Sequence, residues 1–116
     1  MSAQVEHPVA VMPRPERTAE ALRSALAALA PSWIPEFDRS QDEATDKAVE
    51  LGALWPVHAW LRHWAAIVEI ERHPDTSYRY RHAEQIDTLS DDPEVRRRAV
   101  RVSGDIYRAA LDTVGE

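Results

Sequence analysis

Segment 56–72 constrains the fold more than any other part of the chain, because its apolar residues cover more than one side of a helix. The main stripe has helical spacing and consists of Val57, Trp60, Leu61, Trp64, Ile67 and Val68. Ala59, Ala66 and Ile70 widen this stripe beyond that of an ordinary surface helix. Such a helix needs neighbours on several sides, so we place it at the centre of the domain.

The same apolar period recurs along the chain and predicts further helices. We expect them over 18–30, 34–51 and 76–89, and from Pro93 to near the C-terminus. Thr18, Asp75 and Asp92 are suitable N-caps, and Gly52 suits the residue after a helix. No segment shows the strict alternation of a strand. The predicted fold is therefore all-α, a compact bundle of four or five helices.

Length allows one domain, since the chain has 116 residues. Residues 1–17 contain Pro8, Pro13 and Pro15 and no helical period, so we predict a flexible proline-rich arm there. Residues 18–116 form the single helical bundle domain. Gly104 falls inside the last predicted helix, where glycine costs about 1 kcal/mol relative to alanine. We expect a close helix crossing at that position.

Composition excludes several classes of protein. With no cysteine, the chain has no disulfides, no thiolate metal sites and no cysteine nucleophile. Fourteen basic and 20 acidic residues give a charge of −6, which disfavours general attraction to nucleic acid or an anionic membrane. No apolar segment approaches the ~20 residues that a spanning helix needs. We therefore expect a cytoplasmic protein that is not bound to a membrane.

Motifs for catalysis or metal binding are lacking. There is no G-x-S-x-G turn and no glycine-rich phosphate loop. The acidic residues crowd onto one hydrated helix surface, and we expect no carboxylate to stand alone within an apolar stripe. His58 and His63 are five residues apart and so lie on different faces of a helix. Glu69 and His73 have the spacing of two ligands but are only two. We predict no catalytic residue, no metal and no cofactor.

The chain has four tryptophans, and three of them fall within residues 55–64. Trp60 and Trp64 lie on the apolar stripe and are predicted to fill the core, with His58 and His63 as partners for their indole N–H groups. Trp33 and Trp55 lie in connecting segments, so they are candidates for exposed anchors of a protein interface. A small-molecule pocket lined by Trp60, Trp64 and Tyr78 is a further alternative.

Charge is segregated along the chain. Residues 36–50 hold six acidic and two basic residues, and this acidic face includes Glu36, Asp42, Glu43, Asp46 and Glu50. Residues 96–108 hold five arginines and one aspartate. One interpretation is a solvated surface with local pairs such as Glu94–Arg98 and Arg101–Asp105.

Two functional interpretations compete with that one. In the first, the acidic face binds a basic protein partner, because complementary charge speeds association and sets specificity. In the second, the chain is a small DNA-binding regulator whose Arg97, Arg98 and Arg101 contact phosphates. The acidity of the whole chain favours the first. The apolar line along the last helix makes a homodimer through that helix a further alternative.

The order of features from Arg17 to about Tyr80 resembles a family of short actinobacterial proteins of unassigned function. An Ala/Leu-rich helix (residues 18–26) follows a proline-rich arm and precedes the segment Pro35-Glu36-Phe37. A leucine–tryptophan helix (residues 60–65) and the break Pro74-Asp75 complete the run, which covers about half of the chain. The resemblance implies a non-catalytic, antitoxin-like protein whose partner is a small basic toxin. It implies no catalytic residues.

Overall fold

The computed structural model describes residues 9–116, and this part of the chain contains five α-helices. They are α1 (Ala19–Leu29), α2 (Ile34–Leu51), α3 (Trp55–Glu71), α4 (Pro74–Leu89) and α5 (Pro93–Val114). One 3-10 turn, η2 (Pro31–Trp33), precedes α2. No strand occurs among the described residues. The predicted all-α class is therefore confirmed.

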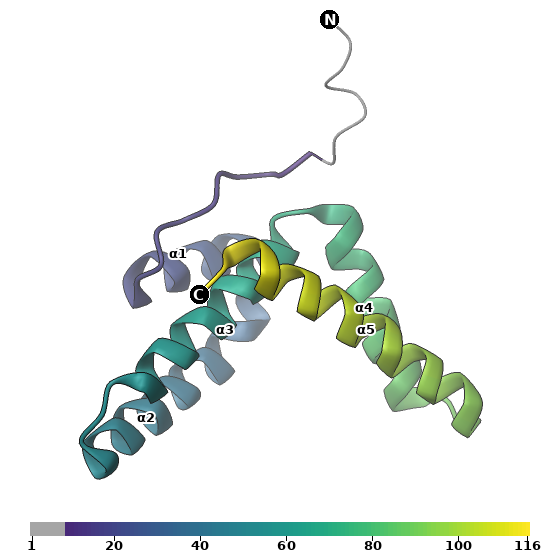
Figure 1. The fold of residues 1–116 in the computed structure, drawn as a ribbon. Helices are drawn as coiled ribbons and strands as arrows, with labels where there is room; N and C mark the ends of the chain where they lie inside the picture. The colour runs from purple at the N-terminus through teal and green to yellow at the C-terminus, as the bar shows by residue number, and fades with distance from the viewer. Residues whose placement is uncertain (1–8) are drawn as a thin grey trace, which may run out of the picture.

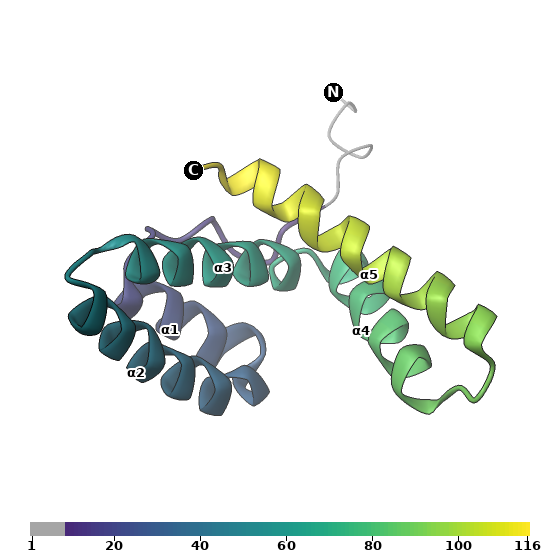
Figure 2. The same ribbon diagram turned by 60° about the horizontal axis from the view of Figure 1, so that its bottom comes forward.

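The helix α3 is the one that all the others share. α1 and α2 pack against it, and so do α4 and α5, but no Cα of α1 or α2 lies within 8 Å of α4 or α5. In Figure 1, α2 and α3 form one arm, α4 and α5 form the other, and the two arms diverge. Figure 2 shows α1 and α2 on one side of α3, with the α4–α5 hairpin extending away from them. The central place predicted for segment 56–72 is confirmed.

Local signals set the helix ends. The Thr18 hydroxyl accepts a hydrogen bond from the Ala21 amide at 3.1 Å, and the Asp92 carboxylate accepts one from the Glu94 amide at 2.9 Å. Gly52 ends α2 in the left-handed conformation, with φ of 62°. α4 begins at Pro74, two residues earlier than predicted, because proline fits the first turn, where no amide donor is needed.

The core is divided into two clusters. The larger one joins α1, α2 and α3 through Leu22, Ala25, Leu26, Phe37, Trp60, Trp64, Ile67 and Val68. The smaller one joins α3 to α5 through Ala66, Ile70, Ile106 and Ala110. The predicted burial of Trp60 and Trp64 is confirmed, and Trp64 is completely inaccessible to solvent.

Gly104 does not mark a helix crossing. The closest heavy atoms to a Cβ placed there would be the guanidinium nitrogens of Arg108, at 3.4 and 3.5 Å, and Arg108 belongs to the same helix. The expected close approach of a second helix at this position was therefore wrong. The arginine side chain lies over the glycine instead.

Residues 9–17 contain no helix, and several of them are bonded to the helical domain. The Val11 amide donates to the Arg72 carbonyl at 2.8 Å, and Arg72 donates to the Met12 carbonyl at 3.0 Å. Arg17 donates to the Glu116 carbonyl at 2.7 Å. Residues 11–17 are thus tied to α3 and to the end of the chain, whereas residues 1–8 of the predicted flexible arm lie outside the described part.

None of the helices within residues 9–116 combines the length and the apolar character needed to cross a membrane.

Candidate protein-interaction surface

The acidic face lies entirely on α2. All five of its predicted members are exposed, namely Glu36, Asp42, Glu43, Asp46 and Glu50. Phe37 is buried on the other side of the helix, against α3. The structure therefore gathers these carboxylates on one solvent-facing helix, as the spacing predicts.

Three of the carboxylates have a basic neighbour on the same helix. Arg39 forms ion pairs with Glu36 at 2.6 Å and with Glu43 at 2.5 Å. Lys47 lies 3.6 Å from Glu50. All these side chains are exposed, so each pair contributes little to stability. The pairs reduce the charge that the first part of the helix presents to a partner.

Asp42 and Asp46 are the exceptions. Neither forms an ion pair with any residue of the described chain, and they lie one helical turn apart. Asp38, by contrast, is bonded to Arg23 of α1 at 2.8 Å, and the hydrogen bond from Arg23 lowers the pKa of the Asp38 carboxyl. The carboxylates of the acidic face without a basic partner are therefore Asp42 at the middle of α2 and Asp46 one turn later.

The structure separates the two tryptophans predicted as exposed anchors. Trp55, the first residue of α3, has 62 % of its surface exposed. Trp33 is half-buried, packs edge-on against Trp64 with ring centroids 5.6 Å apart, and donates its indole N–H to Glu71 at 2.8 Å. The expectation that both are exposed is corrected for Trp33, because the turn η2 points its ring into the core.

Exposed large apolar side chains gather along the chain where α2 connects to α3. Four large apolar side chains within seven positions are at least half exposed: Val49 (79 %), Leu51 (50 %), Leu54 (68 %) and Trp55 (62 %). We refer to these four residues as the apolar tip. It adjoins the last turns of the acidic face, where Asp46 and Glu50 are exposed. Large exposed apolar side chains with polar neighbours mark interaction sites.

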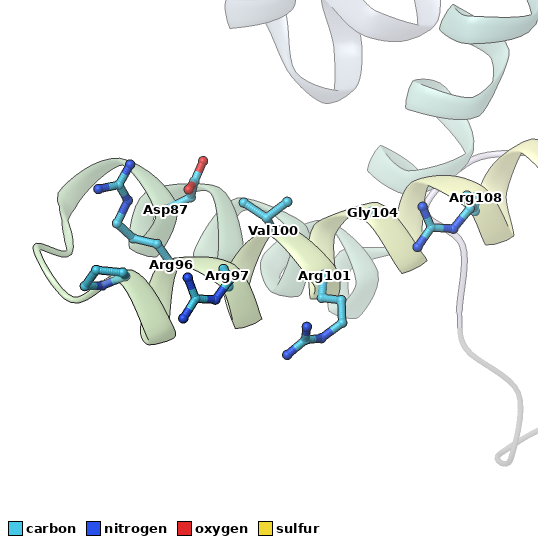
Figure 3. Close-up of a pocket in the computed structure, with 8 residues that line it drawn as sticks. Asp87, Arg96, Arg97, Val100, Arg101, Gly104 and Arg108 are labelled. Carbon is cyan, nitrogen blue, oxygen red and sulfur yellow. The ribbon is translucent and has the colours of Figure 1, made fainter.

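The three arginines predicted for phosphate contact do not form one surface. Arg97 and Arg101 line a hollow of about 650 Å³ together with Arg96 and Arg108. In Figure 3, Arg97 and Arg101 extend on the same side of α5. Arg98 lines a different groove, between α4 and α5. The adjacent positions 97 and 98 point in directions about 100° apart on a helix, which explains this division.

Some of the arginine charge is locally compensated. Arg97 pairs with Glu94 at 2.9 Å and Arg108 pairs with Asp105 at 2.5 Å. Both pairs are three residues apart, whereas the sequence suggested Glu94–Arg98 and Arg101–Asp105 at four. Arg98 and Arg101 have no ion pair within the described chain.

Sequence reasoning missed two buried carboxylates at the end of α3. Glu69 is bonded to Arg14 and to Arg72, each at 2.9 Å, and the ring of His73 lies 3.8 Å from it. Burial by itself raises the pKa of Glu69, but the hydrogen bonds from Arg72 and Arg14 outweigh burial and lower it. The carboxylate thus holds residues of the N-terminal segment on α3.

The second carboxylate, Glu71, is bonded on several sides. It accepts hydrogen bonds from the Trp33 indole at 2.8 Å, the Ser77 hydroxyl at 2.8 Å and the Arg81 guanidinium at 2.6 Å. These donors come from η2 and α4, so Glu71 links both sides of α3. The sequence signal was the placement of Glu69 and Glu71 among apolar residues, which a hydrated-surface interpretation overlooked.

The indoles of Trp60 and Trp64 bond to a serine and not to the predicted histidines. Both donate to the Ser40 hydroxyl oxygen, at 2.8 and 3.2 Å. His58 is exposed, and His63 is hydrogen-bonded to the Tyr107 hydroxyl at 2.6 Å. Burial lowers the pKa of His63, with Glu36 acting in the opposite direction. His63 therefore joins α3 to α5.

Neither a metal centre nor the proposed tryptophan pocket is assembled in the part of the chain that the structure describes. Residues 9–116 contain no cluster of three or more histidines and carboxylates placed to hold an ion. Trp64 is fully enclosed in the larger core cluster, while Tyr78 lies exposed on α4. The two rings therefore do not line a common cavity with Trp60.

A family model described as a family of unknown function (DUF6247) matches residues 10–114 of the chain. No curated protein and no solved structure shows significant similarity to the chain.

Proposed function

The chain belongs to this family of unknown function, and we propose that it is a non-catalytic, antitoxin-like protein-interaction module of the cytoplasm that binds a basic protein partner. The observation that carries the proposal is the apolar tip beside the second half of the acidic face. Exposed large apolar residues supply the contact area, and the unpaired carboxylates of Asp42 and Asp46 supply the charge preference.

Trp55 is the natural anchor of such an interface. Tryptophan is enriched among the residues that dominate binding energy, and Trp55 lies at the end of a rigid helix. Leu54 precedes it and Leu51 lies across the turn, so a partner pocket would enclose an apolar group of three side chains. The neighbouring carboxylates would guide a basic partner toward this contact.

A basic toxin would fit this surface by its charge. Contact with α2 would cover cationic groups of the partner, and covering them would block any anionic substrate of that partner. This mode of neutralisation requires no catalytic residue in the chain. The order of features from Arg17 to about Tyr80, which resembles a family of short proteins of unassigned function, implies the same antitoxin-like role.

DNA binding is the second candidate, favoured by the hollow that four arginines line on α5. Arg98 lies outside that hollow and Arg97 is paired with Glu94, so fewer charges converge than the sequence suggested. A gel shift over a range of salt concentrations tests this candidate. Phosphate contacts would give retardation that weakens steeply as salt rises.

The main experiment uses a synthetic helical peptide of lysine and leucine as the probe, with a glutamate–leucine peptide as its acidic counterpart. Fluorescence anisotropy measures binding of each labelled peptide to the full chain. We expect the lysine peptide to bind and the glutamate peptide not to bind. Trp55→Ala should weaken binding by about tenfold or more, as for an interface anchor.

Charge variants separate the local surface from the net charge. Asp42→Lys with Asp46→Lys should abolish the preference for the lysine peptide. Glu84→Lys with Asp112→Lys changes the net charge equally at exposed sites on α4 and α5 and should leave binding largely intact. Leu89→Ala is the matched control for Trp55→Ala, since Leu89 is also exposed. Equal loss in both charge variants, or no binding at about 100 μM, would overturn the proposal.

A further inference from the structure

A groove between α4 and α5 has the opposite character to the acidic face. Its volume is about 430 Å³, and its walls are formed mainly by Tyr78, Ile86, Val95, Ala99 and Val102. Arg79 and His82 of α4 and Arg98 of α5 also line it, and no acidic side chain does. We refer to this feature as the α4–α5 groove. Its lining is therefore mainly apolar, and its charged members are basic.

Small side chains leave this groove open. Ala83 of α4 and Ala99 of α5 line the groove and are buried, so no large side chain fills it at these two positions. Tyr78 and Val102 consequently remain 69 % and 41 % exposed. An apolar surface of this kind in the described chain is one that a partner would cover.

The α4–α5 groove is complementary to the apolar tip. The tip offers Val49, Leu51, Leu54 and Trp55 beside the exposed carboxylates of Asp46 and Glu50. The groove offers apolar lining residues together with Arg79 and Arg98. Neither arginine forms an ion pair within the described chain. Both apolar and charged parts can therefore pair when the tip enters the groove.

The two surfaces cannot meet within one molecule in this fold. The tip lies at the far end of the α2–α3 arm, and the groove lies on the other arm, α4–α5 (Figure 1). No Cα of α2 approaches α4 or α5 within 8 Å. Any contact between tip and groove must therefore join two molecules.

We propose that the chain self-associates by docking the apolar tip of one copy into the α4–α5 groove of a second copy. Each copy carries one tip and one groove, so two copies related by a two-fold axis satisfy both contacts at once. The inference rests on the proposed function, because the tip is the same docking surface. In the pair the tip is covered, so a basic partner protein must displace the second copy to bind.

The test is a charge exchange measured by sedimentation velocity on the full chain. The tip variant carries Asp46→Arg and Glu50→Arg, and the groove variant carries Arg79→Glu and Arg98→Glu. Each variant alone would oppose like charges at both contacts and should sediment as a monomer. An equimolar mixture restores opposite charges at both contacts and should sediment as a pair, as the natural chain does.

Two controls keep the result interpretable. Circular dichroism measures whether each variant is folded. We expect both to be folded, because all four substituted positions are exposed. Glu84→Arg with Asp112→Arg changes the net charge as the tip variant does and should associate like the natural chain. Trp55→Ala should also weaken association by about tenfold or more, since it removes the largest apolar group of the tip.

The inference is overturned if the natural chain stays monomeric at about 100 μM. It is also overturned if either single variant associates like the natural chain, or if the mixture stays monomeric. The lysine–leucine peptide distinguishes this failure from failure of the proposed function. The groove variant has an unchanged tip and should not self-associate. If it binds the lysine–leucine peptide, the proposed function stands even where self-association fails.

Discussion

The two helix pairs that flank α3 differ in how they are built. α1 and α2 enclose large side chains, with Phe37, Trp60 and Trp64 packed ring against ring at centroid distances of 4.7 and 5.2 Å. On α4 and α5 the buried residues that line their common groove are the small Ala83 and Ala99, and Ile106, which packs against α3, is the largest buried side chain on either helix. One pair therefore surrounds a filled aromatic core, whereas the other leaves apolar surface in contact with solvent.

This difference explains where the candidate interaction surfaces lie. The aromatic core absorbs most of the apolar residues of α1–α3, so only the apolar tip at the end of the arm stays outside. The α4–α5 hairpin has no comparable core, and its grooves and exposed side chains occur along its length. We therefore expect the first pair to contribute more to stability than the second.

The largest expected effect is the loss of stability when the Trp64 side chain is removed. Trp64→Ala is expected to lower the free energy of unfolding by about 3–5 kcal/mol, because it leaves a cavity in the larger core cluster. Ile106→Ala in the smaller cluster should cost about 2–3 kcal/mol. Urea unfolding of both variants measures the two values. A greater loss for Ile106→Ala would show that the hairpin contributes more to stability than its small side chains indicate.

The free energy of unfolding should depend on pH through His63, which bonds α3 to Tyr107 of α5. Its pKa lies below the ordinary value of 6.5, chiefly because the ring is buried, so the folded state resists protonation more than the unfolded state. The contribution of His63 to stability is therefore complete above about pH 6.5 and is lost as the pH falls through the lowered pKa. The loss is about 1.4 kcal/mol for each unit by which the pKa is lowered.

Urea unfolding at about pH 7.5 and about pH 5.5 measures this effect. His63→Gln keeps a polar group beside Tyr107 but cannot be protonated, so the variant should lose less stability between the two pH values. An equal loss in both proteins would assign the pH dependence to other groups.

The smallest expected effect concerns the outer surface of the hairpin. Gly104→Ala should raise the free energy of unfolding by up to about 1 kcal/mol, because alanine is the better helix former and only the flexible end of Arg108 must move. Gly52→Ala is the matched control and should lower stability, since the φ of 62° at that turn is strained for alanine. Thermal unfolding measures both. Destabilisation by Gly104→Ala would mean that the hairpin needs the glycine for its own packing.

Several elements could be read from local sequence because the forces that form them are local. The Thr18 and Asp92 caps, the left-handed Gly52 and the apolar stripe of α3 each depend on a few adjacent residues. The face of α2 on which the five carboxylates lie also follows from helical spacing. Burial of Trp60 and Trp64 follows from their position on the widest apolar stripe.

Other features depended on residues distant in the sequence. The buried Glu69 pairs with Arg14, 55 positions earlier in the sequence. Trp33 is drawn inward by Glu71, 38 positions later. Neither of these contacts leaves a periodic signal in the chain.

The sequence by itself determined that the chain is helical, that segment 56–72 is its centre and that opposite charges lie on different helices, because periodicity and charge order are properties of neighbouring residues. Only the tertiary structure decided that the helix pairs diverge, that Trp55 is outside while Trp33 is not, and that an open groove lines the hairpin. Those outcomes depend on how side-chain volumes fill the space between helices, and small residues on α4 and α5 left that space partly empty.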